Sequence, residues 1–406
     1  MWSRNRFIEG CILVMVSLAV GACGASKASS SSSSPPPAPA ALACNSKTGL
    51  TQPLSVCSAA SPCTNGFQIV NGTFKTGVTL TTTSEVPTCA TGNGILNDGP
   101  PMAWQDADGV THYTCLFIPN GTNSSTSKRP LVIFFHGGGG NASSVYDQTG
   151  LRVKADTNPL LGGGYDLSGD AARPGFILAS VQGRNLLWPS IRPSGSYHDN
   201  YYRDMNSPSS NPDVAHVDHL IDTLVAQGAD PQQIYTMGWS NGAEFAQFYA
   251  IARHDTPTPG GNHVAAAAVY AFANPFANID WNQSPSCELD PYPKSEVPIY
   301  LVNRACDSYT ACSTAQQTAF NLEPGFSAEE WFTQIKDPAF VGNSNVQFQR
   351  LDPQAQPVAA CTDLQPASGC TVAFGTREHL TWPGLYDTNN DWEPTMLDFL
   401  KAHPHP

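Results

Sequence analysis

A serine placed between two glycines is the first candidate for chemistry in this chain. Ser240 lies in Gly238-Trp239-Ser240-Asn241-Gly242. The apolar and β-branched residues 234–237 before it are typical of a buried strand, and residues 243–250 after it show helical spacing without a breaker. A serine on a tight turn between strand and helix stands clear of the sheet, where a base can take its proton. Since the five-residue pattern alone is a weak signal, this context carries the prediction that Ser240 is a nucleophile.

The same turn predicts a place for negative charge. The helix after Ser240 would aim its first free N–H, that of Asn241, at a substrate carbonyl oxygen. A second glycine run begins at Gly137 and Gly138, directly after His136 at the end of an expected strand. Glycines let backbone N–H groups approach an oxyanion closely. We expect Asn241 with Gly137 or Gly138 to form an oxyanion hole; a flexible glycine loop is the alternative.

A nucleophilic serine needs a base and an orienting acid, and after a turn of this kind they follow in the order serine, acid, histidine at the ends of later strands. His379 follows an expected strand at 371–374 and is the candidate base. Asp307 lies in the loop after an expected strand at 297–302 and is the candidate acid. Other aspartates lie before that strand or after the histidine, and we disfavour them: Asp290, Asp387 and Asp391.

Alternating strands and helices must position these residues. Besides those already named, we expect strands at 112–119, 131–135, 176–181, 264–272 and 346–351 and helices at 214–225, from Ser327 with Glu330 as a capping box, and at 395–402. His216 and His219 would lie on the polar surface of the first of these helices. The alternation predicts an α/β fold with a mainly parallel sheet covered by helices on both faces.

The N-terminus has the features of an export signal. Residues 1–22 contain Arg4 and Arg6, an apolar run and Gly21-Ala22 before Cys23, which resembles a bacterial lipobox. We expect a lipoprotein signal peptide, acylation of Cys23, and a Ser/Pro/Ala-rich tether over 23–43. This places the protein in a bacterial cell envelope, lipid-anchored at the outer membrane or cell surface; free secretion after ordinary cleavage is the alternative.

Residues 44–110 are rich in Thr, Gly, Asn and Pro, and we expect a cysteine-containing N-terminal β extension before a catalytic domain at 111–406. Without Cys11 and Cys23, ten of the 12 cysteines remain, and an even number in an exported chain indicates disulfides. Three pairs are close enough in sequence to close small loops: Cys57/Cys63, Cys306/Cys312 and Cys361/Cys370. No C-x-x-C pair suggests zinc or redox chemistry, so we expect no metal.

The acidic composition limits the partners. A net charge of −13 argues against nucleic acid and anionic membrane surfaces, which leaves the N-terminal lipid as the expected membrane contact.

Several motifs together resemble a known family. Asp230-Pro231 ahead of the serine turn, the turn itself, and His379 shortly before Thr381-Trp382-Pro383-Gly384 resemble the polyhydroxybutyrate depolymerase and feruloyl esterase branch of the α/β-hydrolases, over residues 111–402. The resemblance implies secreted serine esterases that cleave short hydroxyacyl or aromatic esters without a cofactor. The chain departs from that branch at Leu380, which follows the histidine, and at Asn303-Arg304, where His-Gly is common.

We therefore expect an exported, lipid-anchored serine esterase acting on a small-molecule or polymeric ester. Ser240 would attack, His379 would carry the proton and Asp307 would orient the histidine. Trp239 and Trp382, with Trp188, are candidate rim residues, as aromatic planes suited to short or flat groups; a position in the core is the equal alternative for Trp188 and Trp382. A serine peptidase of the same fold and a non-catalytic envelope binding protein are the alternatives.

Overall fold

The computed structural model describes part of the chain, namely residues 69–70, 73–74, 82–107, 109–186, 196–200, 208–271, 274–276, 294–310, 327–351, 377–384 and 390–406. The expected signal peptide, Cys23, the tether, the strand at 371–374 and Trp188 lie outside these residues. So do Asp290 and Asp387, and at least one cysteine of each close pair.

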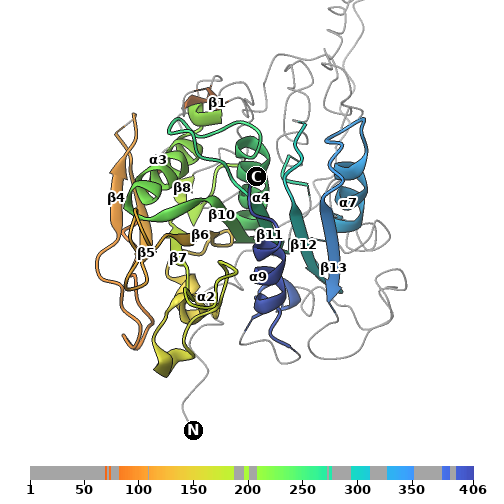
Figure 1. The fold of residues 1–406 in the computed structure, drawn as a ribbon. Helices are drawn as coiled ribbons and strands as arrows, with labels where there is room; N and C mark the ends of the chain where they lie inside the picture. Colours follow the sequence, from red (N-terminus) through yellow and green to blue (C-terminus); the bar gives the residue numbers. More distant parts are fainter. Residues whose placement is uncertain are drawn as a thin grey trace, which may run out of the picture. The chain divides into compact units, whose positions relative to one another are not determined.

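The described residues contain an eight-stranded sheet with the strand order β13-β12-β11-β10-β6-β7-β5-β4 (Figure 1). Its strands are β4 Met102–Gln105, β5 Thr111–Phe117, β6 Arg129–Phe135, β7 Ile177–Val181, β10 Ala229–Trp239, β11 Ala266–Tyr270, β12 Ile299–Arg304 and β13 Val346–Leu351. The strands from β13 to β7 run parallel to one another, and β5 and β4 are antiparallel to their neighbours. The predicted α/β architecture with a mainly parallel sheet is confirmed.

The N-terminal segment is joined to this sheet in two ways. Strand β4 lies inside the expected extension but pairs with β5 as the last strand of the main sheet. A disulfide connects Cys89 to Cys115 in the middle of β5, with Cα atoms 5.2 Å apart. Short strands form two smaller sheets: β1 Ile69–Val70 with β2 Thr73–Phe74, and β3 Thr82–Thr83 with β8 Arg184–Leu186 and β9 Ser196–Tyr197.

Helices cover both faces of the main sheet. On one face, Leu131, Ile133 and Phe135 pack in a core cluster with α3 Pro212–Gln227, α4 Asn241–Arg253 and α7 Ala328–Lys336. On the other, Val132 and Phe134 pack with α1 Ser144–Asp147, α2 Leu151–Ala155 and α9 Glu393–Lys401. This division follows from the strand period of two, which sends alternate side chains to opposite faces. Two 3₁₀ turns are η3 Pro159–Leu161 and η4 Pro208–Ser210, and residues 377–379 are also helical.

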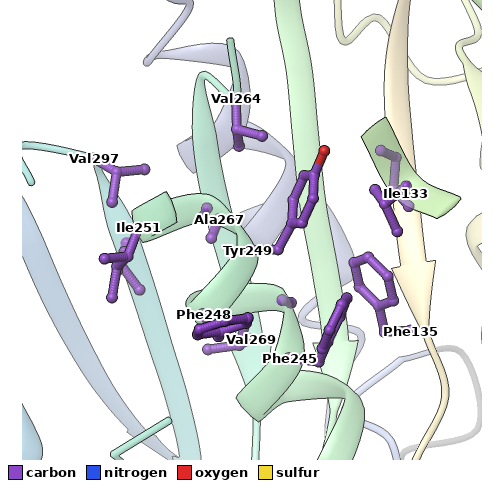
Figure 2. Packing of buried hydrophobic residues seen from close by; sticks show 14 of the residues in the cluster. Ile133, Phe135, Phe245, Phe248, Tyr249, Ile251, Val264, Ala267, Val269 and Val297 are labelled. Atoms are coloured by element: carbon purple, nitrogen blue, oxygen red, sulfur yellow. The ribbon is translucent and has the colours of Figure 1, made fainter. Parts of the chain in front are cut away.

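Helix α4 is the central helix of the first cluster, and nearly all of its side chains are buried. Figure 2 shows Phe245 facing Phe135 of β6, and their rings meet edge to face with centroids 5.1 Å apart. Phe248 and Tyr249 lie beside Phe245 on the same helix. Burying each such side chain stabilises the fold by about 1.5–3 kcal/mol. This packing fixes α4, and therefore the residue that precedes it, against the sheet.

Two predictions about the helices are confirmed, and one prediction about a histidine on α3 is wrong. The side chain of Ser327 caps α7, as expected: its hydroxyl oxygen accepts the backbone N–H of Glu330 at 3.3 Å. His219 is exposed on α3, as predicted. His216 is not a surface residue: it is buried, and its Nε2 lies 3.2 Å from Thr114 Oγ1 of β5. The surface prediction for His216 is wrong because the buried face of α3 includes polar residues as well as the aliphatic ones from which the face was predicted.

The C-terminal segment lies near the beginning of β10. The N–H of His405 donates to the carbonyl oxygen of Gln232 at 2.8 Å, close to the amino end of that strand. Ser240 lies at the opposite, carboxyl end. In the described part of the chain, no helix combines the length and the apolar character needed to cross a bilayer.

Candidate active site

Ser240 occupies the sharp turn that its flanking glycines predict. Strand β10 ends at Trp239, α4 begins at Asn241, and between them Ser240 has φ 55° and ψ −123°. Few non-glycine residues adopt a positive φ, and such strain is concentrated at functional sites. A Cβ on Gly238 would overlap the carbonyl of Gly242, and a Cβ on Gly242 would overlap the carbonyl oxygen of Phe135. Both positions therefore require glycine.

His379 and Asp307, far apart in sequence, meet Ser240 at this edge of the sheet. His379 Nε2 lies 2.8 Å from Ser240 Oγ, and His379 Nδ1 lies 2.9 Å from Asp307 Oδ2. An ionised carboxylate only accepts hydrogen bonds, so Nδ1 carries the proton and Nε2 is free to accept the serine hydroxyl. Both side chains are buried. The three predicted residues thus form a continuous hydrogen-bonded chain.

The backbone holds the acid in place. Asp307 Oδ1 accepts the N–H groups of Tyr309 at 2.8 Å and Thr310 at 2.9 Å. The side chain of Asn303, at the end of β12, donates to the carbonyl of Thr310 at 3.0 Å. These bonds fold the loop after β12 back on itself, so the carboxylate faces His379 in one orientation.

Side chains from neighbouring strands hold the histidine segment. Trp239 Nε1 donates to the carbonyl oxygen of His379 at 2.8 Å, and Tyr270 Oη donates to that of Glu378 at 2.8 Å. Trp239 ends β10 and Tyr270 ends β11, so the base is fixed to the same strands that carry the serine and its neighbours.

Trp382 explains the motif that follows the histidine, but it does not lie at a rim. It is 2% exposed, its ring meets Phe134 edge to face, and its Nε1 donates to buried Glu393 at 2.7 Å. A Cβ on Gly384 would lie 2.5 Å from the same carboxylate. Of the two positions considered for Trp382, the structure shows the core, where this residue connects the histidine segment to α9. Trp239 is also buried, at 7% exposure.

Strained backbone recurs at the ends of three adjacent strands. In the described residues, three non-glycine residues have positive φ: Ser240 at 55°, Ala271 at 60° and Cys306 at 67°. They follow β10, β11 and β12 respectively. Each of these residues with positive φ turns the chain at the carboxyl edge of the sheet, and this edge is where the hydrogen-bonded chain of Ser240, His379 and Asp307 lies.

The glycine run after β6 lies against the serine turn. A Cβ on Gly137 would come 3.5 Å from Ser240 Cβ. The loop is shaped by its later members, since Gly139 N–H donates to Ser196 and Gly140 N–H donates to Gly137. Among the described residues, no acceptor takes a hydrogen bond from the N–H of Gly137, Gly138 or Asn241. These three N–H groups are the predicted oxyanion donors.

His136 supports the glycine loop as a neutral side chain. Its Nε2 accepts the N–H of Gly183 at 2.9 Å, so its Nδ1 carries the proton and donates to the carbonyl of Gly137 at 2.8 Å. Burial lowers the pKa of His136 to about 4. The imidazole thus joins the loop to the segment after β7 without introducing a charge beside Ser240.

Two tyrosines near the serine were missed by the sequence analysis. The ring of Tyr309 lies 4.7 Å from that of His379 and is 37% exposed. The ring of Tyr197 in β9 covers Gly138, where a Cβ would come 2.5 Å from it. Tyr309 follows the acid by two residues, which could have indicated it. Tyr197 comes from a short strand with no motif, so the sequence carried no signal for it.

The segment after Tyr197 also contacts the serine turn. The side chain of Asn241 accepts the N–H of His198 at 2.8 Å and donates to its carbonyl at 3.1 Å. This two-bond contact leaves the backbone N–H of Asn241 free for another partner. Within the described residues, no group of three His, Cys, Asp or Glu side chains is arranged to hold a metal ion.

The chain matches no protein-family model and no curated protein. Among solved structures it is similar to a thermostable esterase, with 16% identity, a TM-score of 0.37 and coverage of 76% of this chain. The chain spans 63% of that esterase's length. It is also similar to an S-formylglutathione hydrolase from Agrobacterium tumefaciens, with 10% identity, a TM-score of 0.41 and coverage of 75% of this chain and 95% of that one. Vibralactone cyclase gives 14% identity, a TM-score of 0.40 and coverage of 74% and 79%.

Proposed function

We propose that this protein is a serine hydrolase of carboxylic esters. The observation that carries the proposal is the chain of contacts from Ser240 Oγ to His379 Nε2 at 2.8 Å and from His379 Nδ1 to Asp307 Oδ2 at 2.9 Å. This geometry gives a serine a base within reach and gives the base a fixed tautomer, which are the requirements for an activated nucleophile.

The reaction follows from the placement of these groups. Ser240 Oγ attacks the ester carbonyl carbon while its proton passes to His379 Nε2, and Asp307 stabilises the imidazolium that forms. The negative charge on the carbonyl oxygen is held by the N–H groups of Asn241 and of Gly137 or Gly138. The imidazolium then gives its proton to the leaving alcohol, and an acyl-enzyme remains. Water, activated by the same histidine, releases the acid and restores Ser240.

For the substrate we propose short acyl, hydroxyacyl polyester or feruloyl-type esters. The support is local: the rings of Tyr197 and Tyr309 lie against Gly138 and His379, on either side of the reacting groups. Aromatic planes of this kind suit flat or compact acyl groups.

A labelling experiment with a substrate series tests this function. A fluorophosphonate probe should label the protein, and Ser240→Ala should abolish both the labelling and the hydrolysis of p-nitrophenyl esters. Initial rates should be higher on p-nitrophenyl acetate and butyrate than on the octanoate and palmitate, with methyl ferulate and a polyhydroxybutyrate film assayed beside them. The highest kcat/KM on palmitate would contradict the short-ester proposal. Cleavage of peptides alone would indicate the peptidase, and a folded but unlabelled and inert protein would indicate the binding protein.

We further propose that Cys23 carries a lipid and holds the enzyme at a bacterial membrane or cell surface, where an extracellular ester would be met. The supporting feature is the lipobox-like end of the apolar run followed by the Ser/Pro-rich tether. In cells that express the full chain, Cys23→Ala should move ester hydrolysis from the membrane fraction to the soluble fraction. An unchanged membrane fraction would contradict the anchor.

A further inference from the structure

A buried ion pair connects the loop of the acid to the segment of the base. Arg304 is the last residue of β12, three residues before Asp307, and Glu378 directly precedes His379. Arg304 Nε lies 3.3 Å from Glu378 Oε2, and the two side chains are 1% and 0% exposed. Arg304 also stands at one of the positions where the chain departs from the family that it resembles.

Tyr270 joins the same pair. Its hydroxyl donates to the backbone carbonyl of Glu378 at 2.8 Å, and Arg304 Nε donates to that hydroxyl at 3.2 Å. Burial raises the pKa of Tyr270; the positive charge of Arg304 opposes this rise, and the negative charges of Asp307 and Glu378 add to it. The phenol therefore stays neutral and keeps its proton to donate. It also lies close enough to all three charges to experience their field.

We propose that Arg304 and Glu378 are positioning residues that set the distance and angle between Asp307 and His379. The proposal rests on the proposed function, in which those two residues act as acid and base. A buried ion pair adds little stability compared with apolar residues of the same volume, but it fixes which atoms meet. Here the atoms that meet belong to the two segments whose relative position decides the orientation of the imidazole.

The opposite charges of Arg304 and Glu378 also offset each other's effect on the protonation of His379. His379 is faced by Asp307, by the ring of Tyr309 and by Ser240, and Glu378 is faced by Arg304 and Tyr270. Glu378→Gln removes one negative charge near the imidazole of His379, and the resulting more positive surroundings disfavour protonation of that ring. The acid limb of the kcat/KM profile should therefore move to lower pH. Removal of both charges in Arg304→Met/Glu378→Gln should return it.

The test compares pH profiles for p-nitrophenyl butyrate hydrolysis in the full chain. For Glu378→Gln we expect kcat to fall about tenfold to a hundredfold because the base is misplaced, with a smaller change in KM. The acid-limb midpoint should drop by about one pH unit, which corresponds to about 1.4 kcal/mol of lost stabilisation of the protonated base. The double variant should keep the low kcat but show the wild-type midpoint.

Asp218→Asn is the matched control. Asp218 Oδ2 lies 2.6 Å from Nη2 of buried Arg253. Arg253 is the last residue of α4, about 20 Å along the helix from Ser240. This variant breaks a buried ion pair of the same kind and should leave the kcat/KM midpoint unchanged.

Two results would overturn the inference: wild-type kcat and midpoint in Glu378→Gln, or an equal midpoint shift in Asp218→Asn. If Glu378→Gln does not fold, the double variant decides, since wild-type kcat in it would overturn the positioning role and a low kcat with an unshifted midpoint would support it. A wild-type protein that is neither labelled nor active refutes the proposed function itself, and the inference falls with it. An active wild type with unchanged variants refutes the inference alone.

Discussion

The backbone of Ser240 is held at φ 55°, a conformation that costs about 1–3 kcal/mol in a non-glycine residue. The packing of α4 behind it offsets this cost, because that helix is buried along nearly its whole length. The strain lifts the hydroxyl away from the strand and toward His379. A serine in ordinary strand or helix geometry at this position would point along the sheet or into the core instead.

At the residue scale, Asp307 gives a sharp prediction. Asp307→Asn should leave the fold intact and lower kcat roughly 10⁴-fold, because an amide can donate to Nδ1 and stabilise the wrong tautomer of His379. Ester hydrolysis and circular dichroism of the purified variant measure the two effects.

Asp290→Asn and Asp387→Asn serve as controls, since these are two of the three aspartates that the sequence disfavours as the acid. Near-native activity in Asp307→Asn, together with its loss in either control, would show that the acid is a different residue.

Residue types and their order in the chain were enough to predict that Ser240, Asp307 and His379 come together, because residues that follow parallel strands meet at one edge of the sheet. Residue types and their order did not predict which polar and aromatic side chains are buried. His216 follows the helical period of a polar face but lies under the strand β5, and Trp382 belongs to a loop that folds into the core. Such placements depend on contacts between distant segments, and a local pattern does not encode them.

At the scale of elements, α4 approaches β6 backbone to backbone. No side chain separates them at Gly242, whose Cβ would overlap the carbonyl oxygen of Phe135. This contact sets the depth at which the helix sits and hence the height of Ser240 above the sheet.

We therefore predict that Gly242→Ala destabilises the protein by about 3 kcal/mol or more and abolishes activity, because the overlap with the backbone can be relieved only by moving the helix. Gly92→Ala is the matched control: a Cβ there meets nothing within 4 Å, and its unfolding free energy should stay within about 0.5 kcal/mol of the wild type. Urea unfolding compares the two. Equal midpoints would mean that the elements are not in close contact.

The periodic elements of the main sheet were predictable because buried parallel strands and amphipathic helices leave strong patterns. The boundary of the N-terminal extension was not. Strand β4 is four residues long and its side chains alternate between half-buried and exposed, so its short pattern did not separate it from the expected N-terminal β extension. Its pairing with β5 through a short turn at Asp106–Val110, where Asp106 N–H donates to Val110, became visible only in the structure.

At the scale of the whole molecule, the buried histidines make stability depend on pH. Burial lowers the pKa of His136 to about 4 and those of His198 and His216 well below their usual value. Each is neutral in the folded state and gains a proton near pH 6.5 when unfolded. A depressed folded-state pKa gives stability that is present above about 6.5 and is lost as the pH falls toward the folded value.

The free energy of unfolding should therefore fall between pH 7 and pH 4, with His136 alone contributing about 3 kcal/mol of the loss. Urea unfolding at a series of pH values measures the slope. His216→Gln should reduce that slope, since one buried imidazole is removed, whereas His219→Gln, at an exposed position on the same helix, should keep it. Identical slopes in both variants would contradict the role of the buried rings.

The position of His405 beside Gln232 has a practical consequence for attaching the protein to a solid support through its C-terminal segment. Strand β10 runs from that contact to Trp239, which separates the C-terminal segment from the serine by about 20–25 Å of extended chain. A bead, a carrier domain or a sensor surface joined beyond Pro406 would occupy the amino side of the sheet. The support would then lie away from the edge of the sheet that carries Ser240, so a protein coupled in this orientation would not have its support beside that edge.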